Sequence, residues 1–247
     1  MDVKYHLSPL LLLASLSGGV LPNSAAIAQE QPQQARLNVT PLRLELPAGQ
    51  AATQMLVRNQ GEKQIAVQMR VFEWTQDGGE NHYAPSRDVA VSPSIVKIEP
   101  GLAQSFHILS RGTPATSGER RFRVVLDEIP DSEPAAPGTA RTRLRLTLPL
   151  FIGSNTAQAG RLQVAAQPGV LILANGGGRT IRLSDLQVTA DGNPVPIDNY
   201  SMLQYIHGAS WIAIPLPDGV ACSGEVLRLS ATADGGSFDE IASQDCP

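Results

Sequence analysis

Apolar and polar residues alternate along most of the chain, and the clearest alternation covers residues 141–152. The apolar positions of this run are Leu144, Leu146, Leu148 and Leu150. A period of two over this length is typical of a β-strand with one apolar face. Pro149 lies inside the run and has no N–H to give to a neighbouring strand, so the sequence predicts an edge strand or a bulge here.

A long edge strand that carries a row of leucines is normally an aggregation hazard. Such a strand is therefore covered by another part of the protein or displayed for a partner, because strand addition to a free edge is a recurring recognition mode. The alternative is a buried sandwich strand whose arginines are solvated. The pattern alone favours this alternative, whereas features elsewhere in the chain favour a strand that is displayed for a partner.

Shorter alternating runs fill the remainder of the chain, separated by turns rich in glycine and proline. No helical periodicity interrupts them. Runs between Leu37 and Ile152 have the spacing of an immunoglobulin-like sandwich, and a second series begins near Arg161. The predicted fold class is therefore all-β, with two immunoglobulin-like β-sandwich domains, residues 36–153 and 154–247.

The first residues have the composition of an export signal. Residues 1–28 combine a basic end, the apolar run Leu10–Leu13 and the small residues around Ala28, which is the pattern of a cleaved secretory signal peptide. Residues 29–35 are polar and are predicted to be a disordered lead-in. No other stretch is long and apolar enough for membrane insertion.

The two cysteines, Cys222 and Cys246, are an even number in an exported chain, which predicts a disulfide. Chain entropy assigns such a loop a stabilisation of roughly 3 kcal/mol.

The charge and the reactive residues exclude several classes of function. The net charge of −4 argues against a nucleic-acid partner. The histidines after residue 28 are far apart, so no metal-ligand spacing occurs. No nucleophile motif and no phosphate-binding loop is found. The sequence therefore predicts a protein that is not an enzyme and needs no cofactor.

A series of short motifs follows the chain in a characteristic order. These motifs are Val57–Gly61, Glu73–Gly79, Ile98–Gln104, Glu119–Val124 and Leu148–Phe151. Each is weak alone, but their order resembles that of the periplasmic pilus-assembly chaperones of the chaperone–usher pathway. The Leu-Pro-Leu-Phe end of the long strand resembles the archaic branch, which is associated with spore-coat-U-type pilins.

The resemblance implies a periplasmic protein with two sandwiches in an L-shaped arrangement. It also implies partners, namely pilin subunits that lack one strand and an outer-membrane usher that receives them. The chaperone would lend its edge strand to the subunit, with Leu144, Leu146, Leu148 and Leu150 as the donor residues. The sequence leaves open whether free molecules associate through the same strand.

The family also anchors the subunit's C-terminal carboxylate with basic residues between the two domains. Arg43 matches the arginine of the first strand, and His107 stands where the family usually has another arginine. Pro149 occupies the position of a second anchoring lysine, so the family's two-residue anchor is not carried over intact. Arg123 matches a family arginine whose role, structural or binding, the sequence does not separate.

Two other classes of function compete with this hypothesis. One is a secreted two-domain adhesin or carbohydrate-binding module, and the other is a periplasmic hydrolase. A lectin should show clustered aromatic residues or acidic calcium loops, yet aromatic residues make up only 4% of the chain. The leucine-bearing edge strand followed by a second sandwich favours the chaperone.

Overall fold

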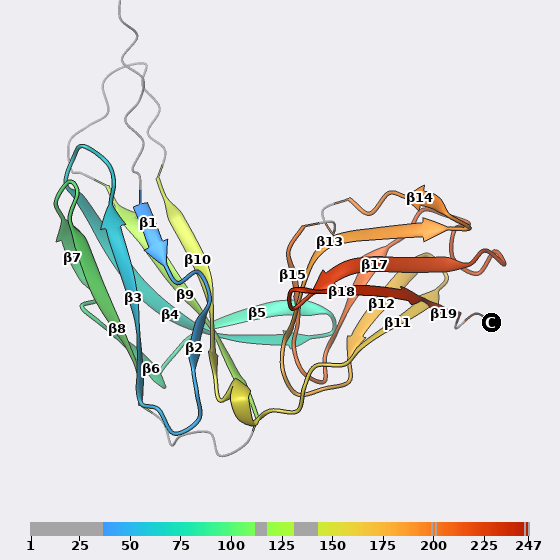
Figure 1. Ribbon diagram of the computed structural model, residues 1–247, viewed down its shortest axis with the longest axis horizontal. Helices are drawn as coiled ribbons and strands as arrows, with labels where there is room; N and C mark the ends of the chain where they lie inside the picture. Colours follow the sequence, from blue (N-terminus) through green and yellow to red (C-terminus); the bar gives the residue numbers. More distant parts are fainter. Residues whose placement is uncertain are drawn as a thin grey trace, which may run out of the picture. The chain divides into compact units, whose positions relative to one another are not determined.

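The structure is a computed structural model that describes residues 37–111, 118–130, 143–198, 200, 202–244 and 246. The predicted signal peptide and the predicted lead-in lie outside these residues. Within the described part the chain forms strands and one short 3-10 turn (Ser154–Thr156), as Figure 1 shows. The predicted all-β fold of two β-sandwiches is confirmed. No described helix has the length and apolar character needed to cross a membrane.

The first sandwich consists of two packed sheets. One sheet has the strand order β1-β3-β8-β6, and the other has the order β2-β10-β9-β4-β5, with β7 paired to β4. The strands of the first sheet are β1 (Leu37–Thr40), β3 (Ala52–Asn59), β6 (Val89–Ser92) and β8 (Ala103–Ser110). Those of the second are β2 (Leu44–Leu46), β4 (Ile65–Asp77), β5 (Glu80–Pro85), β7 (Ile95–Ile98), β9 (Arg120–Ile129) and β10 (Arg145–Ile152).

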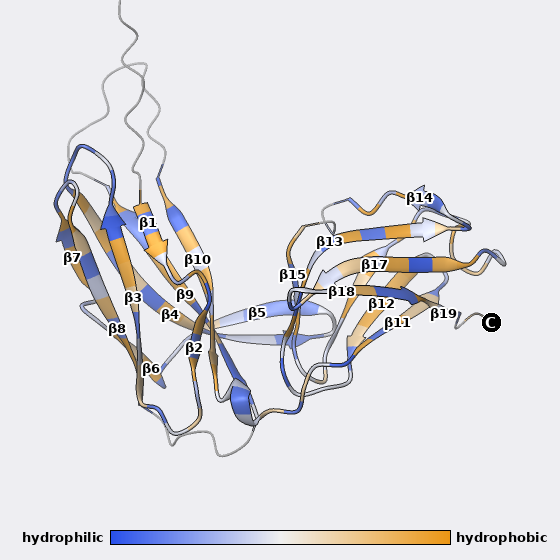
Figure 2. Ribbon diagram, in the orientation of Figure 1, coloured by the Kyte–Doolittle hydropathy of each residue, from blue (hydrophilic) through white to orange (hydrophobic). Residues whose placement is uncertain are grey.

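Alternation along these strands divides their residues between a core face and an outer face. In β9, Phe122, Val124 and Leu126 are buried in the core between the two sheets. The residues between them point to the outer face of the β2-β10-β9-β4-β5 sheet. Figure 2 shows the same apolar and polar stripes along the strands.

Two short strands on either side of a proline, β1 and β2, belong to different sheets. β1 pairs with β3 in antiparallel fashion, whereas β2 pairs with the end of β10 in parallel fashion. Pro41 lies between the two strands, where its missing N–H removes no hydrogen bond from either ladder.

The second sandwich has its own core, formed by residues between Val164 and Ala242. Its sheets have the orders β16-β12-β11-β19 and β14-β13-β17-β18, with β15 paired to β13. The strands of the first are β11 (Leu162–Gln167), β12 (Val170–Asn175), β16 (Trp211–Pro215) and β19 (Ser243–Gln244). Those of the second are β13 (Ile181–Ala190), β14 (Asn193–Val195), β15 (Gln204–Ile206), β17 (Leu227–Ala233) and β18 (Gly236–Ile241).

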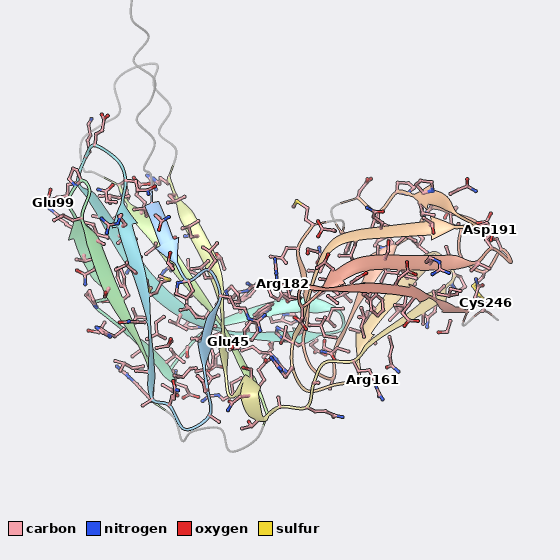
Figure 3. The ribbon with its side chains drawn as sticks, viewed as in Figure 1. Glu45, Glu99, Arg161, Arg182, Asp191 and Cys246 are labelled. Atoms are coloured by element: carbon pink, nitrogen blue, oxygen red, sulfur yellow. A yellow bond between two sulfur atoms is a disulfide. The ribbon has the colours of Figure 1, made fainter. Side chains whose placement is uncertain are left out.

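The predicted disulfide between Cys222 and Cys246 is present and joins the end of the described chain to the second sandwich (Figure 3). Their Cα atoms lie 5.6 Å apart, a separation that suits a disulfide.

The alternation of apolar and polar residues did not predict strands β5 and β18. Every residue of β5 is exposed, so burial imposes no alternation on its composition. The turn at Gly78 and Gly79, both with positive φ, folds β5 back onto β4. β18 follows the turn at Asp234 and Gly235 in the same way. Both strands are held by backbone pairing at a sheet edge, which leaves little trace in side-chain hydropathy.

Polar contacts join the two sandwiches at the start of β9. The Glu119 side chain is fully buried, and its Oε1 accepts hydrogen bonds from the Thr180 N–H at 2.9 Å and the Thr180 hydroxyl at 2.6 Å. Arg121 donates from Nε to the same Glu119 oxygen at 3.1 Å and from Nη2 to the Gly178 carbonyl at 2.8 Å. The Gln76 side chain also bonds backbone groups of Tyr205 and His207.

Candidate functional site

The first half of β10 is a free strand edge within the described part of the chain. On one side β10 pairs with β9 along its full length, from Arg145 to Ile152. On the other side it pairs with β2 only over its last three residues, Leu150–Ile152. Residues 145–149 therefore have no neighbouring strand on that side among the described residues.

The hydrogen-bond pattern shows which groups face the free edge. Glu128 donates its N–H to the Leu144 carbonyl, so the even-numbered residues direct their amides toward β9. Gly153 donates its N–H to the Leu46 carbonyl, which places the odd-numbered amides on the β2 side. The free edge thus presents the N–H and C=O groups of Arg145 and Thr147. Pro149 also faces the β2 side, so its missing N–H costs the β9 ladder nothing.

The four leucines of β10 form a gradient of burial. Leu150 is fully buried and Leu148 is 7% exposed, both in the core of the first sandwich. Leu146 is half-buried against that core, and Leu144, which precedes β10, is also half-buried. The leucines that lie along the free edge are therefore the least engaged with the protein's own core.

Arginines occupy the outer face beside the same edge. Arg145 lies on β10 and donates to the carboxylate of Asp127 on β9. Arg70 on β4 donates to the second oxygen of that carboxylate. Burial alone would raise the pKa of Asp127, but the hydrogen bonds from Arg145 and Arg70 outweigh it and lower the pKa.

An aromatic cluster covers the outer face farther along β9 and β10. Trp74 is buried and contacts Phe151, Tyr205 and His207, with ring centroids at 6.3, 5.3 and 4.2 Å. The guanidinium carbon of Arg123 lies 3.5 Å from the centre of the Trp74 ring and 4.9 Å from that of Tyr205. The cluster therefore includes side chains of both sandwiches.

Arg123 is a cation with an unusual environment. Its Nε is buried without a hydrogen-bond partner, and it forms no ion pair with any described residue. Burial lowers the pKa of Arg123, and the neighbouring Tyr83 and Tyr205 offset only part of that effect. An arginine stays charged in proteins, so this site holds a partly desolvated positive charge that an anion would stabilise.

Arg43 extends the positive charge to the neighbouring strand. Its guanidinium carbon lies 4.5 Å from the centre of the Phe151 ring, and its Nε donates to Glu45 at 2.9 Å. Phe151 in turn contacts Trp74, on which Arg123 stacks. The two arginines are therefore connected through two aromatic rings on one face of the sheet.

The sequence of the first sandwich matches a known family. Residues 36–158 match the family described as pili and flagellar-assembly chaperone, PapD N-terminal domain. The chain belongs to the pilus assembly chaperones. This finding confirms the predicted resemblance, and because members of this family are non-enzymatic, it also confirms that the chain is not an enzyme.

Solved structures with the fold of this chaperone are distant in sequence. A chain of the complex between the chaperone CsuC and the tip adhesion subunit CsuE, from archaic Csu pili of Acinetobacter baumannii, is 21% identical with a TM-score of 0.67. The alignment covers 85% of this chaperone and 99% of that chain. A chain of the Salmonella enterica SafA pilin complex with the SafB chaperone is 17% identical, with a TM-score of 0.63 and coverages of 85% and 98%.

The Escherichia coli chaperone DraB is 16% identical, with a TM-score of 0.62 and coverages of 85% and 97%. No curated protein matches this chaperone. Family membership favours the chaperone hypothesis over the adhesin or carbohydrate-binding module.

The two residues predicted to anchor the subunit lie on different sheets of the chaperone. Arg43 precedes β2, whereas His107 is exposed on β8, where it is in register with Gln54 and Ser92. β8 belongs to the sheet that lacks β10. The structure therefore brings Arg43 close to Phe151 and Arg123, but it does not bring His107 to the same group.

Sequence reasoning did not identify the aromatic residues that contact Arg43 and Arg123. Trp74, Tyr83 and Tyr205 are far apart in the chain, and no motif links them to Arg123. One usable signal was the position of Trp74. It falls among the even-numbered polar positions of β4, on the outer face, where a buried aromatic residue indicates that something covers it. Among the described residues no cluster of three or more His, Cys, Asp or Glu could hold a metal ion.

Proposed function

We propose that this chaperone acts in the periplasm by lending the free edge of β10 to pilin subunits that lack one strand. The observation that supports this proposal most directly is the pairing of β10, which has a neighbour on its β2 side only at residues 150–152. An added strand would find backbone donors and acceptors at Arg145 and Thr147 and would end at Pro149.

The leucine side chains supply the apolar part of the proposed interaction. Leu144, Leu146 and Leu148 lie along the free part of the strand, and they would fill the groove of an incomplete subunit. Complete burial of one leucine is worth roughly 1.5–3 kcal/mol before ordering costs, although Leu148 has little surface left to bury. Leu150 is fully buried in the chaperone's own core, so the proposal does not assign it to the subunit.

The proposal includes an anchor for the subunit's C-terminal carboxylate at Arg43 and Arg123. A guanidinium binds a carboxylate in bidentate fashion, and Arg123 forms no ion pair with a described residue. His107 is not part of this anchor because it lies on the other sheet.

The proposal has two further parts. The chaperone delivers the capped subunit to an outer-membrane usher, and it belongs to the archaic branch of the family.

A pull-down of the tagged chain from the periplasm of its native host tests strand donation. Leu146→Glu places a charge where an apolar groove should receive a leucine, so we expect loss of a co-purifying pilin-like protein. Leu56→Glu is the matched control, because Leu56 is an exposed leucine on β3, in the other sheet. Circular dichroism and urea unfolding establish that each variant is folded, and Leu144→Glu, one residue before β10, provides a second variant.

The same pull-down examines the anchor. Arg43→Ala should lower the yield of the subunit, whereas Arg58→Ala, on the other sheet, should not. Equal capture by wild type, Leu146→Glu and Leu144→Glu would contradict strand donation. Equal capture by Arg43→Ala would contradict the anchor alone.

A further inference from the structure

Arginine side chains line the outer face of β10 next to its free edge. Arg143 and Arg145 are two residues apart, both are exposed, and the Arg145 side chain retains 66% of its accessible surface. Alternate residues of an extended chain lie on the same face. The leucines of the same run lie on the opposite face, where Leu146, Leu148 and Leu150 contact the core. The two faces of this segment therefore carry different chemistry, one apolar and one cationic.

Positive charge is in excess at this place, although the whole chain carries a net charge of −4. The nearby arginines are Arg70, Arg143 and Arg145, and the nearby carboxylates are those of Asp127 and Glu128. Asp127 already bonds two of the arginines. Glu128 accepts a hydrogen bond from the Leu144 N–H. Arg143 forms no ion pair with any residue that the structure describes.

The direction of the backbone groups links these arginines to the free edge. Residues whose amides face the free edge are odd-numbered, and their side chains lie on the outer face. A strand added to this edge would therefore place every second side chain beside Arg143, Arg145 or Thr147. Side chains directly opposite each other in paired strands lie about 4.5–5.5 Å apart between Cβ atoms. That separation lets a carboxylate of the added strand reach an arginine.

We propose that Arg143 and Arg145 select partner strands that carry carboxylates at alternate positions on their solvent-facing side. This inference rests on the proposed strand donation and adds a second determinant to it. The leucines recognise the apolar groove, and the arginines recognise the charge and the register of the strand that borders it. A partner strand with lysine or arginine at the same positions is disfavoured by repulsion between like charges.

The exposed position of these arginines determines what they contribute. Exposed charge pairs add little affinity, but charges at the rim of an interface raise the association rate and penalise the wrong partner. Both effects weaken as salt screens the charges. The contribution of the arginines should therefore appear as a salt-dependent preference among strands, whereas the leucine contribution should not depend strongly on salt.

Binding of synthetic strand peptides to the full mature chain tests the inference. The probes are peptides in which valine alternates with glutamate, with lysine or with glutamine, and fluorescence anisotropy measures their affinity. Wild type should bind the glutamate peptide about tenfold more tightly than the lysine peptide at low salt, because two charged neighbours change sign. The difference should shrink at about 0.5 M salt.

Two double variants show whether the peptide preference depends on the position of the arginines or only on the net charge of the chain. Arg143→Glu/Arg145→Glu should reverse the preference, so that the lysine peptide binds more tightly than the glutamate peptide. Arg161→Glu/Arg182→Glu makes the same change in net charge at exposed arginines of the second sandwich (Figure 3). This control should keep the preference of wild type.

The outcomes distinguish this inference from the function on which it rests. If Leu146→Glu abolishes binding of all three peptides while Arg143→Glu/Arg145→Glu keeps the wild-type preference, strand donation stands and the charge selection is overturned. Equal binding of the glutamate and lysine peptides by wild type at low salt also overturns it. If no peptide binds wild type, or Leu146→Glu binds as well as wild type, strand donation fails and the inference fails with it.

Discussion

At the scale of single residues, His207 is an imidazole buried away from water. It is 2% exposed, lies edge-on to Trp74 and has a buried Nε2 without a hydrogen-bond partner among the described residues. Burial first, and then the positive charges of Arg121 and Arg123, lower the pKa of His207 to about 3. The folded protein therefore holds this imidazole neutral, whereas the unfolded chain protonates it below about pH 6.5.

This difference predicts how stability changes with pH. Between about pH 3 and about pH 6.5 the unfolded state binds one more proton, so acidification favours unfolding. The neutral His207 contributes its stability above about pH 6.5, and that contribution declines as the pH falls. From pH 7 to pH 5 we expect wild type to lose about 2 kcal/mol more unfolding free energy than His207→Gln. Urea unfolding at both pH values measures this, and identical losses would contradict the prediction.

At the scale of the element, β10 combines a core strand and a free edge in one segment. Leu150 is fully buried, and the strand is paired on both sides at that point. Leu144 is half-buried where the β2 side has no described neighbour. One continuous alternation of leucines therefore has two physical roles, and the position of β2 separates them.

Alanine substitutions at the two ends of the leucine row should separate stability from binding. Leu150→Ala leaves a cavity in the core and should lower the unfolding free energy by about 2–5 kcal/mol. Leu144→Ala should cost less than about 1 kcal/mol while it weakens subunit capture. Urea unfolding and the periplasmic pull-down measure the two effects. Similar stability losses at both positions would show that the strand is buried uniformly.

At the scale of the whole molecule, a buried carboxylate joins the two sandwiches. Glu119 accepts hydrogen bonds from Thr180 of the second sandwich and from Arg121 of the first. Removal of one member of a buried charged network leaves its partners without hydrogen bonds. Such a loss commonly lowers the free energy of unfolding by about 3–5 kcal/mol.

We therefore expect Glu119→Ala to lower the unfolding free energy by about that amount. Thr180→Ser is the matched control, since serine keeps both the N–H and the hydroxyl that Glu119 accepts. Urea unfolding of the three proteins compares them, and an unchanged midpoint for Glu119→Ala would mean that the contact between the sandwiches carries little energy.

Much of the fold was predictable because strand formation leaves a local signal. The apolar face of β10 followed from the alternation of its leucines, of which Leu148 and Leu150 are buried in the core. The disulfide followed from two cysteines in a chain predicted to be exported. β5 was missed because none of its side chains is buried, so no alternation marks it.

The candidate site was predictable only in part. Sequence reasoning proposed Arg43 from its motif and grouped His107 with it, but the two residues lie on different sheets. It also left the role of Arg123 open, because Trp74 and Tyr205 come from distant parts of the chain. Contacts between such distant residues depend on the packing of sheets and domains, which a motif does not encode.

The sequence by itself determined which residues of β10 share a face, because successive side chains of an extended backbone point to opposite sides. Only the tertiary structure decided where the edge of that strand is free, since this depends on how far β2, more than a hundred residues earlier in the chain, runs alongside it. Local backbone geometry sets the alternation, whereas long-range strand pairing sets which groups remain available to a partner.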